Sequence, residues 1–205
     1  MAADPLVASL GDASLRRSEA ETLREGQWIN DGVIAFALAL LETRAARVPT
    51  RCLPPSVAAL AAHLPSAADA AAVVGLDWER SQTERLIVPV SDNEDASRAL
   101  GGSHWTLLVW DCERWHHFDS ARRSSSVPSR VTELARKLVP TQHPVVAAET
   151  PQQENGYDCG VFVMLAAAAV YDSTCPVGDA VTPARVNTDA ARRMRQALLE
   201  RIYAG

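Results

Sequence analysis

The segment that decides the fold runs from Pro151 to Leu165 and reads PQQENGYDCGVFVML. Its polar, turn-forming residues give way at Cys159 to an apolar run that ends near Tyr171, and this change predicts a buried helix that begins at Cys159. The unpaired amides and positive dipole end of a helix N-terminus stabilise anions, which favours the reactive thiolate of a cysteine there. Gln153 can approach the sulfur through the turn that precedes the helix, and its amide could donate to an oxyanion.

A packing role for this cysteine is the alternative, since free cysteine behaves as a small hydrophobe and is often buried. A second segment favours catalysis because it supplies the other groups that thiol chemistry needs. It contains SHWTLLVW from Ser103 to Trp110, followed by RWHHFDS from Arg114 to Ser120. Together with Cys159, these runs give a cysteine, a histidine and a carboxylate in one chain.

The two runs predict a β-hairpin. If Cys112 and Glu113 are the central residues of its turn, Thr106 faces Asp119, and His104 lies on the same face, one diagonal step from Asp119. A slip of one residue would send the histidine and the carboxylate to opposite faces, so the prediction depends on this register.

Composition indicates one globular domain over residues 1–205, with 47% hydrophobic and 22% charged residues. The net charge of −5 argues against a nucleic-acid or anionic membrane partner. No apolar run reaches the roughly 18 residues of a membrane span, and we expect a cytosolic or nuclear protein. The four cysteines show no paired CxxC spacing, so we expect reduced thiols, no metal and no cofactor.

The order of the predicted elements indicates an α+β domain, with a helical N-terminal part before a central mixed or antiparallel sheet. Pro89 suggests that its strand is an edge strand or has an irregular ladder. Trp78 is expected to help anchor an alanine-rich helix. The predicted helices cover about 31–47, 55–64, 67–75 and 127–138, a stretch that begins at Cys159 and is ended by Cys175 and Pro176, and the region of 191–202. The predicted strands, besides the hairpin, cover 86–90 and 144–150. Residues 1–26 are expected to be extended or to form short turns.

Three motifs resemble, in order and spacing, the Ulp and sentrin-specific cysteine protease family. His104-Trp105, then Asp119, then Gln153 to Gly160 are similar to the family's core of His-Trp, Asp, and Gln with Asp-Cys-Gly. Trp28-Ile29-Asn30-Asp31 is similar to its Trp-Leu-Asn-Asp motif. The resemblance extends from about Leu6 to Leu165 and implies a papain-like, Ulp-type fold with the catalytic cysteine at a helix N-terminus.

The resemblance also implies a role for each matching residue. Cys159 would be the nucleophile, and His104 the general base and then the general acid. Asp119 would orient the imidazole, and Gln153 would donate to the oxyanion. These roles agree with the chemistry, because a carboxylate that holds one ring N–H fixes the tautomer and leaves the other nitrogen to serve the thiol.

Three further residues would contact substrate if the resemblance holds. Trp28 and Trp105 would flank a narrow channel that accepts a C-terminal Gly-Gly, although core packing of these rings is the alternative. Asp31 would contact a basic residue of the modifier, or would instead satisfy amides at a helix N-terminus.

The function implied is that of a thiol endopeptidase and isopeptidase that cuts after the C-terminal Gly-Gly of a ubiquitin-like modifier. Within the family, the segments 90–93 and 101–105 look most like those of the deneddylating members, and the acidic loop from Asp92 to Asp95 also favours the neddylation modifier. The expected partners are this modifier and its conjugates, such as cullins, bound by a monomer. A SUMO protease, a noncatalytic modifier-binding module and an acyltransferase that uses coenzyme A are the alternatives.

Overall fold

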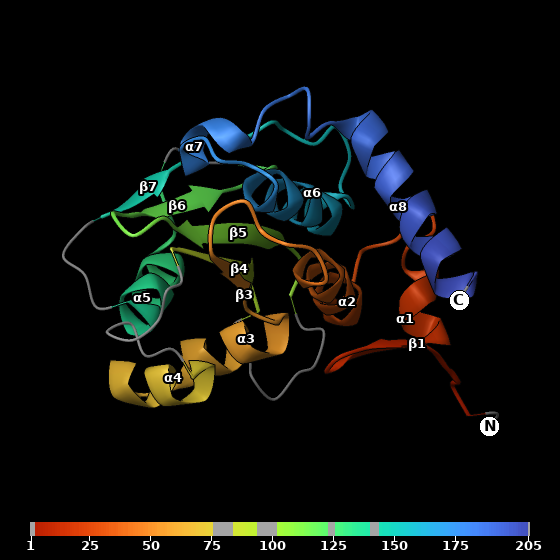
Figure 1. Cartoon of the computed structure of the whole chain (residues 1–205), viewed down its shortest axis with the longest axis horizontal. Coiled ribbons are helices and arrows are strands. Elements are labelled where there is room, and N and C mark those ends of the chain that lie inside the picture. Colours follow the sequence, from red (N-terminus) through yellow and green to blue (C-terminus); the bar gives the residue numbers. More distant parts are fainter. Residues whose placement is uncertain (1–2, 76–83, 94–101, 123–125, 140–143, 205) are drawn as a thin grey trace.

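A five-stranded mixed sheet forms the centre of the protein (Figure 1). The computed structural model describes residues 3–75, 84–93, 102–122, 126–139 and 144–204. The central strands β4, β5 and β6 are antiparallel, while β3 is parallel to β4 and β7 is parallel to β6. In spatial order the strands are β3 (Thr50–Cys52), β4 (Arg85–Ser91), β5 (Trp105–Trp110), β6 (Trp115–Phe118) and β7 (Val145–Ala147).

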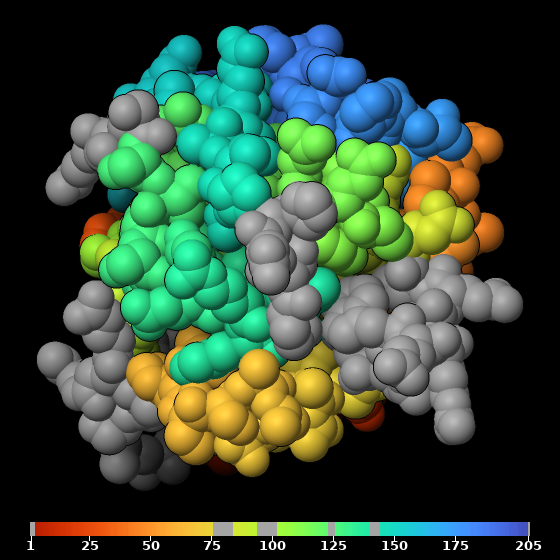
Figure 2. Space-filling model, turned by 90° about the vertical axis from the view of Figure 1, so that its left-hand side faces the viewer, coloured from red at the N-terminus to blue at the C-terminus, as the bar shows by residue number. Residues whose placement is uncertain are grey.

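Helices cover both faces of this sheet and enclose two apolar cores. Alternate residues of β5 enter different cores: Leu107 packs with the helices α2 and α6, whereas Leu108 packs with α3, α4 and α5. Figure 2 shows α3 and α4, in yellow and orange, beside α5 in green. The predicted α+β fold is confirmed. The bounds are α2 (Asp31–Glu42), α6 (Cys159–Tyr171) and α8 (Thr188–Tyr203) on one side, and α3 (Pro55–His63), α4 (Ala67–Val74) and α5 (Ser129–Leu138) on the other.

Helix α6 is the buried centre of the larger core. It contacts β5, α2 and α8, and all but one of its residues are buried. Its sequence is apolar all round, as expected for a helix enclosed on every side. It begins at Cys159, as predicted, and ends at Tyr171, where its apolar run stops, rather than at the predicted Cys175 and Pro176. Among the described residues, no helix has the length and apolarity needed to cross a membrane.

The N-terminal region is extended as predicted in two strands, but it also contains a short helix that was not predicted. It forms an antiparallel hairpin of β1 (Leu6–Leu10) and β2 (Ala13–Arg16), followed by the short helix α1 (Arg17–Glu21). The Glu19 carboxylate accepts a 2.7 Å hydrogen bond from the backbone N–H of Arg16, which helps to start α1.

Several predicted boundaries are also corrected. Helix α2 ends at Glu42 rather than near residue 47, and the short helix α7 (Val177–Ala180) was not predicted. Strand β4 is an interior strand, contrary to the edge position suggested by Pro89. Its pairing with β3 covers only Arg85–Ile87, so the proline lies beyond the end of β3. Trp78 lies outside the described residues.

Candidate active site

The hairpin of β5 and β6 brings His104 and Asp119 together. Leu107 pairs with Phe118 and Trp110 with Trp115, which is the register predicted from a turn centred on Cys112 and Glu113. His104 immediately precedes β5, and Asp119 immediately follows β6. The His104 Nε2 and Asp119 Oδ1 atoms lie 2.8 Å apart. The carboxylate accepts from Nε2–H, which leaves Nδ1 as the ring nitrogen available to a thiol.

The electrostatic balance at His104 favours the imidazolium. Burial by itself lowers the pKa of His104, but hydrogen bonds with Asp119 and Cys159 and the negative charges of both raise it from its ordinary value of 6.5 to about 9. Burial is the largest single influence and raises the pKa of Asp119, but the hydrogen bonds from His104 and from the backbone N–H of Ala121, together with the charges of His104 and His117, lower it overall. The three groups can therefore share one proton between sulfur and imidazole beside an ionised carboxylate.

Cys159 is the first residue of α6 and is only 6% exposed. The next residue, Gly160, allows the helix to begin this close to the N-terminal part of the chain. A Cβ added at Gly160 would lie 2.8 Å from Cβ of Ile29 and 3.5 Å from Cδ1 of Trp105. The first of these distances is shorter than a van der Waals contact, so glycine at this position lets Ile29 and Trp105 pack against the start of α6.

Hydrogen bonds hold Gln153 in place beside the turn that precedes Cys159. Its Oε1 atom accepts a hydrogen bond of 2.8 Å from the Ser120 hydroxyl, and its backbone N–H donates to Ser120 O at 2.7 Å. Its Nε2 donates to Asn155 O at 2.6 Å. An amide nitrogen carries two hydrogens, so Nε2 can donate a second hydrogen bond to an oxyanion. Ser120 follows Asp119 directly, and this places the amide next to the histidine–carboxylate pair.

Of the two predicted channel tryptophans, Trp105 is bonded to the backbone of Ile29, and Trp28 is the residue before Ile29. Trp105 Nε1 donates to Ile29 O at 3.2 Å, which fixes the indole ring against the backbone that carries Trp28. Trp28 itself is 55% exposed, so its ring is not part of the core and is available to a ligand. Core packing is therefore the wrong interpretation for Trp28.

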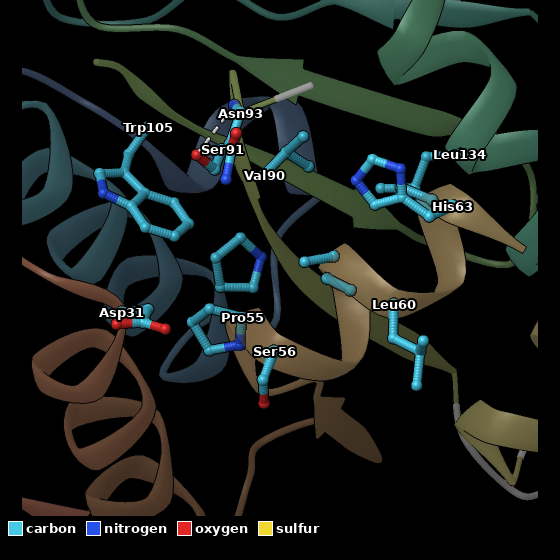
Figure 3. A pocket seen from close by; sticks show the side chains of 14 residues that line it. Asp31, Pro55, Ser56, Leu60, His63, Val90, Ser91, Asn93, Trp105 and Leu134 are labelled. Carbon is cyan, nitrogen blue, oxygen red and sulfur yellow. Dashed lines mark hydrogen bonds between the residues drawn. The ribbon is translucent and has the colours of Figure 1, made fainter. Parts of the chain in front are cut away.

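Asp31 and Trp105 line one end of a cavity of about 320 Å³ (Figure 3). The cavity continues past Pro55 toward His63 and Leu134 at its other end. Asp31 Oδ1 accepts a 3.0 Å hydrogen bond from the backbone N–H of Gly32, which supports its predicted role at the helix N-terminus. Because it also faces the cavity, its carboxylate can meet a ligand there as well.

The acidic loop from Asp92 to Asp95 was expected to favour a modifier, but the Asp92 carboxylate is bound within the protein. Its carboxylate accepts hydrogen bonds from the backbone N–H of Ser103 and His104, at 2.5 and 2.9 Å, and from the Ser103 hydroxyl at 2.7 Å. The side chain thus holds the backbone of the histidine and does not extend freely toward a partner. Glu94 and Asp95 lie outside the described residues.

Two other residues of the site were missed by sequence reasoning. Ser120 anchors Gln153, and Arg195 of α8 forms a buried ion pair with Asp158, with 2.7 Å between Nη2 and Oδ1. Their partners are distant in sequence, so no local pattern marks them. The signal that the sequence offers for Arg195 is an arginine on the face of the helix that is otherwise apolar, with Ala191, Leu198 and Ile202.

Comparison with known proteins agrees with this geometry. Residues 82–194, more than half of the chain, match the C-terminal catalytic domain of the Ulp1 protease family. NEDD8-specific protease 1 of Arabidopsis thaliana is 32% identical over 181 residues, covering 82% of this chain and 76% of the relative. Sentrin-specific protease 8 of Mus musculus is 30% identical over 180 residues, covering 83% of this chain and 80% of the relative.

The fold is also similar to that of solved structures. The C-terminal Ulp1 protease domain in complex with Smt3, the yeast orthologue of SUMO, superposes with a TM-score of 0.69 at 18% identity, covering 100% of this chain and 89% of that chain. At this sequence identity, structural similarity shows only that the folds are alike. The family match and the relatives show that the sequences are related as well. The chain therefore belongs to the Ulp1 protease family of cysteine proteases that act on ubiquitin-like modifiers.

Proposed function

We propose that this protein hydrolyses the bond after the C-terminal Gly-Gly of a ubiquitin-like modifier, with the neddylation modifier NEDD8 as its preferred substrate. The observation that carries the proposal is the placement of His104 between two partners. One ring nitrogen lies 2.8 Å from the Asp119 carboxylate, and the ring also interacts with Cys159 at the start of α6. A thiol, an imidazole and a carboxylate in this order can perform acyl transfer.

The reaction begins with attack of the Cys159 sulfur on the carbonyl carbon of the terminal glycine. His104 holds the proton of the thiol, and the carbonyl oxygen becomes an oxyanion that accepts from Gln153 Nε2. Collapse of this intermediate breaks the C–N bond, and His104 gives its proton to the leaving amine. The amine is an α-amine in a precursor and a lysine ε-amine in a conjugate. Water, deprotonated by His104, then hydrolyses the thioester and releases the modifier carboxylate and the free thiol.

The proposed selectivity for two glycines assigns the walls of the channel to Trp28 and Trp105. Trp105 is fixed to the backbone of Ile29, and Trp28 is the residue before it. A channel between two flat rings would admit residues without a Cβ and reject larger ones. The cavity beyond Trp105 and Asp31 would receive the residues that precede the Gly-Gly pair (Figure 3).

The preference for NEDD8 rests on the relatives. Two of them are named NEDD8-specific protease 1 or sentrin-specific protease 8 and share 30–32% identity with this chain, whereas the Ulp1–Smt3 structure shares 18%. SUMO is therefore the second candidate substrate. Cullins are the proposed NEDD8 conjugates. We further propose that residues 1–205 act as a single monomeric domain in the cytoplasm or nucleus.

A panel of fluorogenic modifiers tests the proposal. NEDD8, SUMO and ubiquitin would each carry the same reporter amide at the C-terminus, and kcat/KM would be measured for each. We expect NEDD8 to be hydrolysed fastest, and we expect no turnover by Cys159→Ala. Faster hydrolysis of SUMO would overturn the choice of modifier.

A second experiment separates the other classes of protein. NEDD8 ending in an electrophilic warhead should form an adduct with wild-type protein and none with Cys159→Ala. Binding without an adduct would indicate a noncatalytic module. Acetyl transfer from coenzyme A without peptide cleavage would indicate an acyltransferase.

A further inference from the structure

Arg195 is a charged side chain in the middle of the C-terminal helix, yet it is only 5% exposed. Its guanidinium donates to Asp158 Oδ1 from both Nε and Nη2, at 3.0 and 2.7 Å. It also lies over the Tyr157 ring, 5.6 Å from the ring centroid. A buried guanidinium loses its hydration, so a folded protein keeps one only where its hydrogen bonds are well satisfied.

On one side, Arg195 holds the turn that leads into the nucleophile. Its partner Asp158 directly precedes Cys159, and the other carboxylate oxygen of Asp158 accepts from Asn155 Nδ2 at 2.8 Å. The carbonyl of Asn155 in turn accepts from Gln153 Nε2. The guanidinium is therefore connected, through two side chains, to the amide proposed to bind the oxyanion.

On the other side, Arg195 holds the N-terminal segment that carries Trp28. Nη1 donates to the carbonyls of Thr22 and Arg24 at 3.0 and 3.1 Å, and Nη2 donates to Gln27 O at 2.9 Å. Gln27 is the residue before Trp28. One planar group thus binds both the segment of the tryptophan and the turn of the cysteine, and its rigid geometry fixes the separation between them.

We propose that Arg195 is a positioning residue that sets the distance between the Trp28 wall of the channel and the Cys159 nucleophile. The inference rests on the proposed function, since it concerns how a Gly-Gly tail is placed against the sulfur. Lysine at this position would keep the charge but would lose the fork that reaches both segments.

The test compares Arg195→Lys with wild type and with Arg192→Lys. Arg192 is one turn earlier on α8, its side chain is 63% exposed, and it pairs with Asp189 at the surface. The fraction of competent enzyme is first titrated with the warhead modifier, so that misfolded protein is not counted. Per competent site, we expect Arg195→Lys to reduce kcat/KM for the modifier substrate roughly 10- to 100-fold, because small misplacements of reacting groups have effects of this size. Arg192→Lys should match wild type.

A second readout distinguishes channel geometry from general damage. Alkylation of Cys159 by iodoacetamide requires the thiol and His104 but not the channel, so its rate should be preserved in Arg195→Lys. Combining Arg195→Lys with Trp28→Ala should cause less loss than the product of the two single losses, because both changes affect the same wall.

The outcomes separate this inference from the proposed function. A wild-type protein that hydrolyses no modifier would contradict the function itself. An active wild type with an equally active Arg195→Lys would overturn the positioning role. The same holds if alkylation falls in parallel with turnover, or if the losses from Arg195→Lys and Trp28→Ala multiply independently.

Discussion

His104 is the residue at which structure and chemistry meet most directly. It lies in the short link before β5, where the backbone N–H groups of Ser103 and His104 are held by the Asp92 carboxylate, while its ring is held by Asp119. Both the backbone and the side chain of the histidine are therefore fixed before a substrate arrives. Such preorganisation is what an efficient proton carrier requires.

The first prediction concerns the pH dependence of turnover. Because the pKa of His104 is raised from 6.5 to about 9, the imidazolium that protonates the leaving amine is present below pH 9 and lost above it. We expect kcat/KM to fall with increasing pH near pH 9 in wild type and at lower pH in Asp119→Asn. Folding stability should depend on pH in the same direction, because the contribution of protonated His104 is fully present below pH 6.5 and is lost as pH rises through about 9. A pH–rate profile of both proteins checks the shift, and an unmoved limb in the variant would contradict it.

The second prediction concerns the oxyanion donor. Gln153→Ala removes one amide donor, and we expect kcat to fall roughly 100- to 1000-fold while adduct formation at Cys159 remains detectable. Gln196→Ala is a matched control, since Gln196 is an exposed glutamine on α8 that pairs with Glu200. Steady-state kinetics would measure kcat for both variants. A decrease in kcat of less than threefold in Gln153→Ala would show that Gln153 is not the oxyanion donor.

At the scale of elements, the start of α6 is the position where three segments meet. The helix, the indole of Trp105 and the Ile29 backbone are in contact there, and Gly160 allows the approach. The apolar run from Cys159 to Tyr171 made the start of this helix predictable, and the hairpin register followed from an assumed turn at Cys112 and Glu113 that the family resemblance supported. Strand β3 was missed because its three residues give too short a pattern, and the β1–β2 hairpin was missed because its alternation is weak.

The third prediction uses two glycines of the same region. Gly160→Ala places a Cβ 2.8 Å from Ile29, and we expect a loss of about 1–3 kcal/mol in the free energy of unfolding from overpacking. Gly156→Ala, in the preceding turn, meets nothing within 4 Å and should change stability little. Denaturant unfolding of both variants gives the comparison. Equal stabilities would show that the α6 start tolerates a side chain.

At the scale of the whole molecule, the central sheet separates two cores, and polar side chains connect distant parts of the chain across the larger one. Arg85 of β4 is 6% exposed and donates to the carbonyls of Val170, Ser173 and Cys175 at the end of α6. Such long-range contacts explain why the proposed catalytic residues could be picked out from the sequence, whereas the buried arginines that support the fold around them could not. The motif residues can be recognised by their spacing along the sequence. The partners of Arg85 and Arg195 are far away in sequence and are brought near only by the tertiary fold.

The fourth prediction follows from the Arg85 contacts. Arg85→Met keeps most of the volume but leaves three carbonyls at a helix end without their donor, so we expect a loss of about 3 kcal/mol in the free energy of unfolding. Arg193→Met changes an exposed arginine of α8 and serves as the matched control. Thermal unfolding compares the two, and a small effect of Arg85→Met would mean that water replaces the guanidinium.

The bond from Arg195 to Gln27 spans 168 positions of sequence and has a consequence during synthesis. During synthesis, Cys159 leaves the ribosome before α8, because α8 follows it in the chain. Until that helix docks, the tryptophan wall and the sulfur lack their common anchor, so the nascent polypeptide should be a poor protease even with every motif residue already translated.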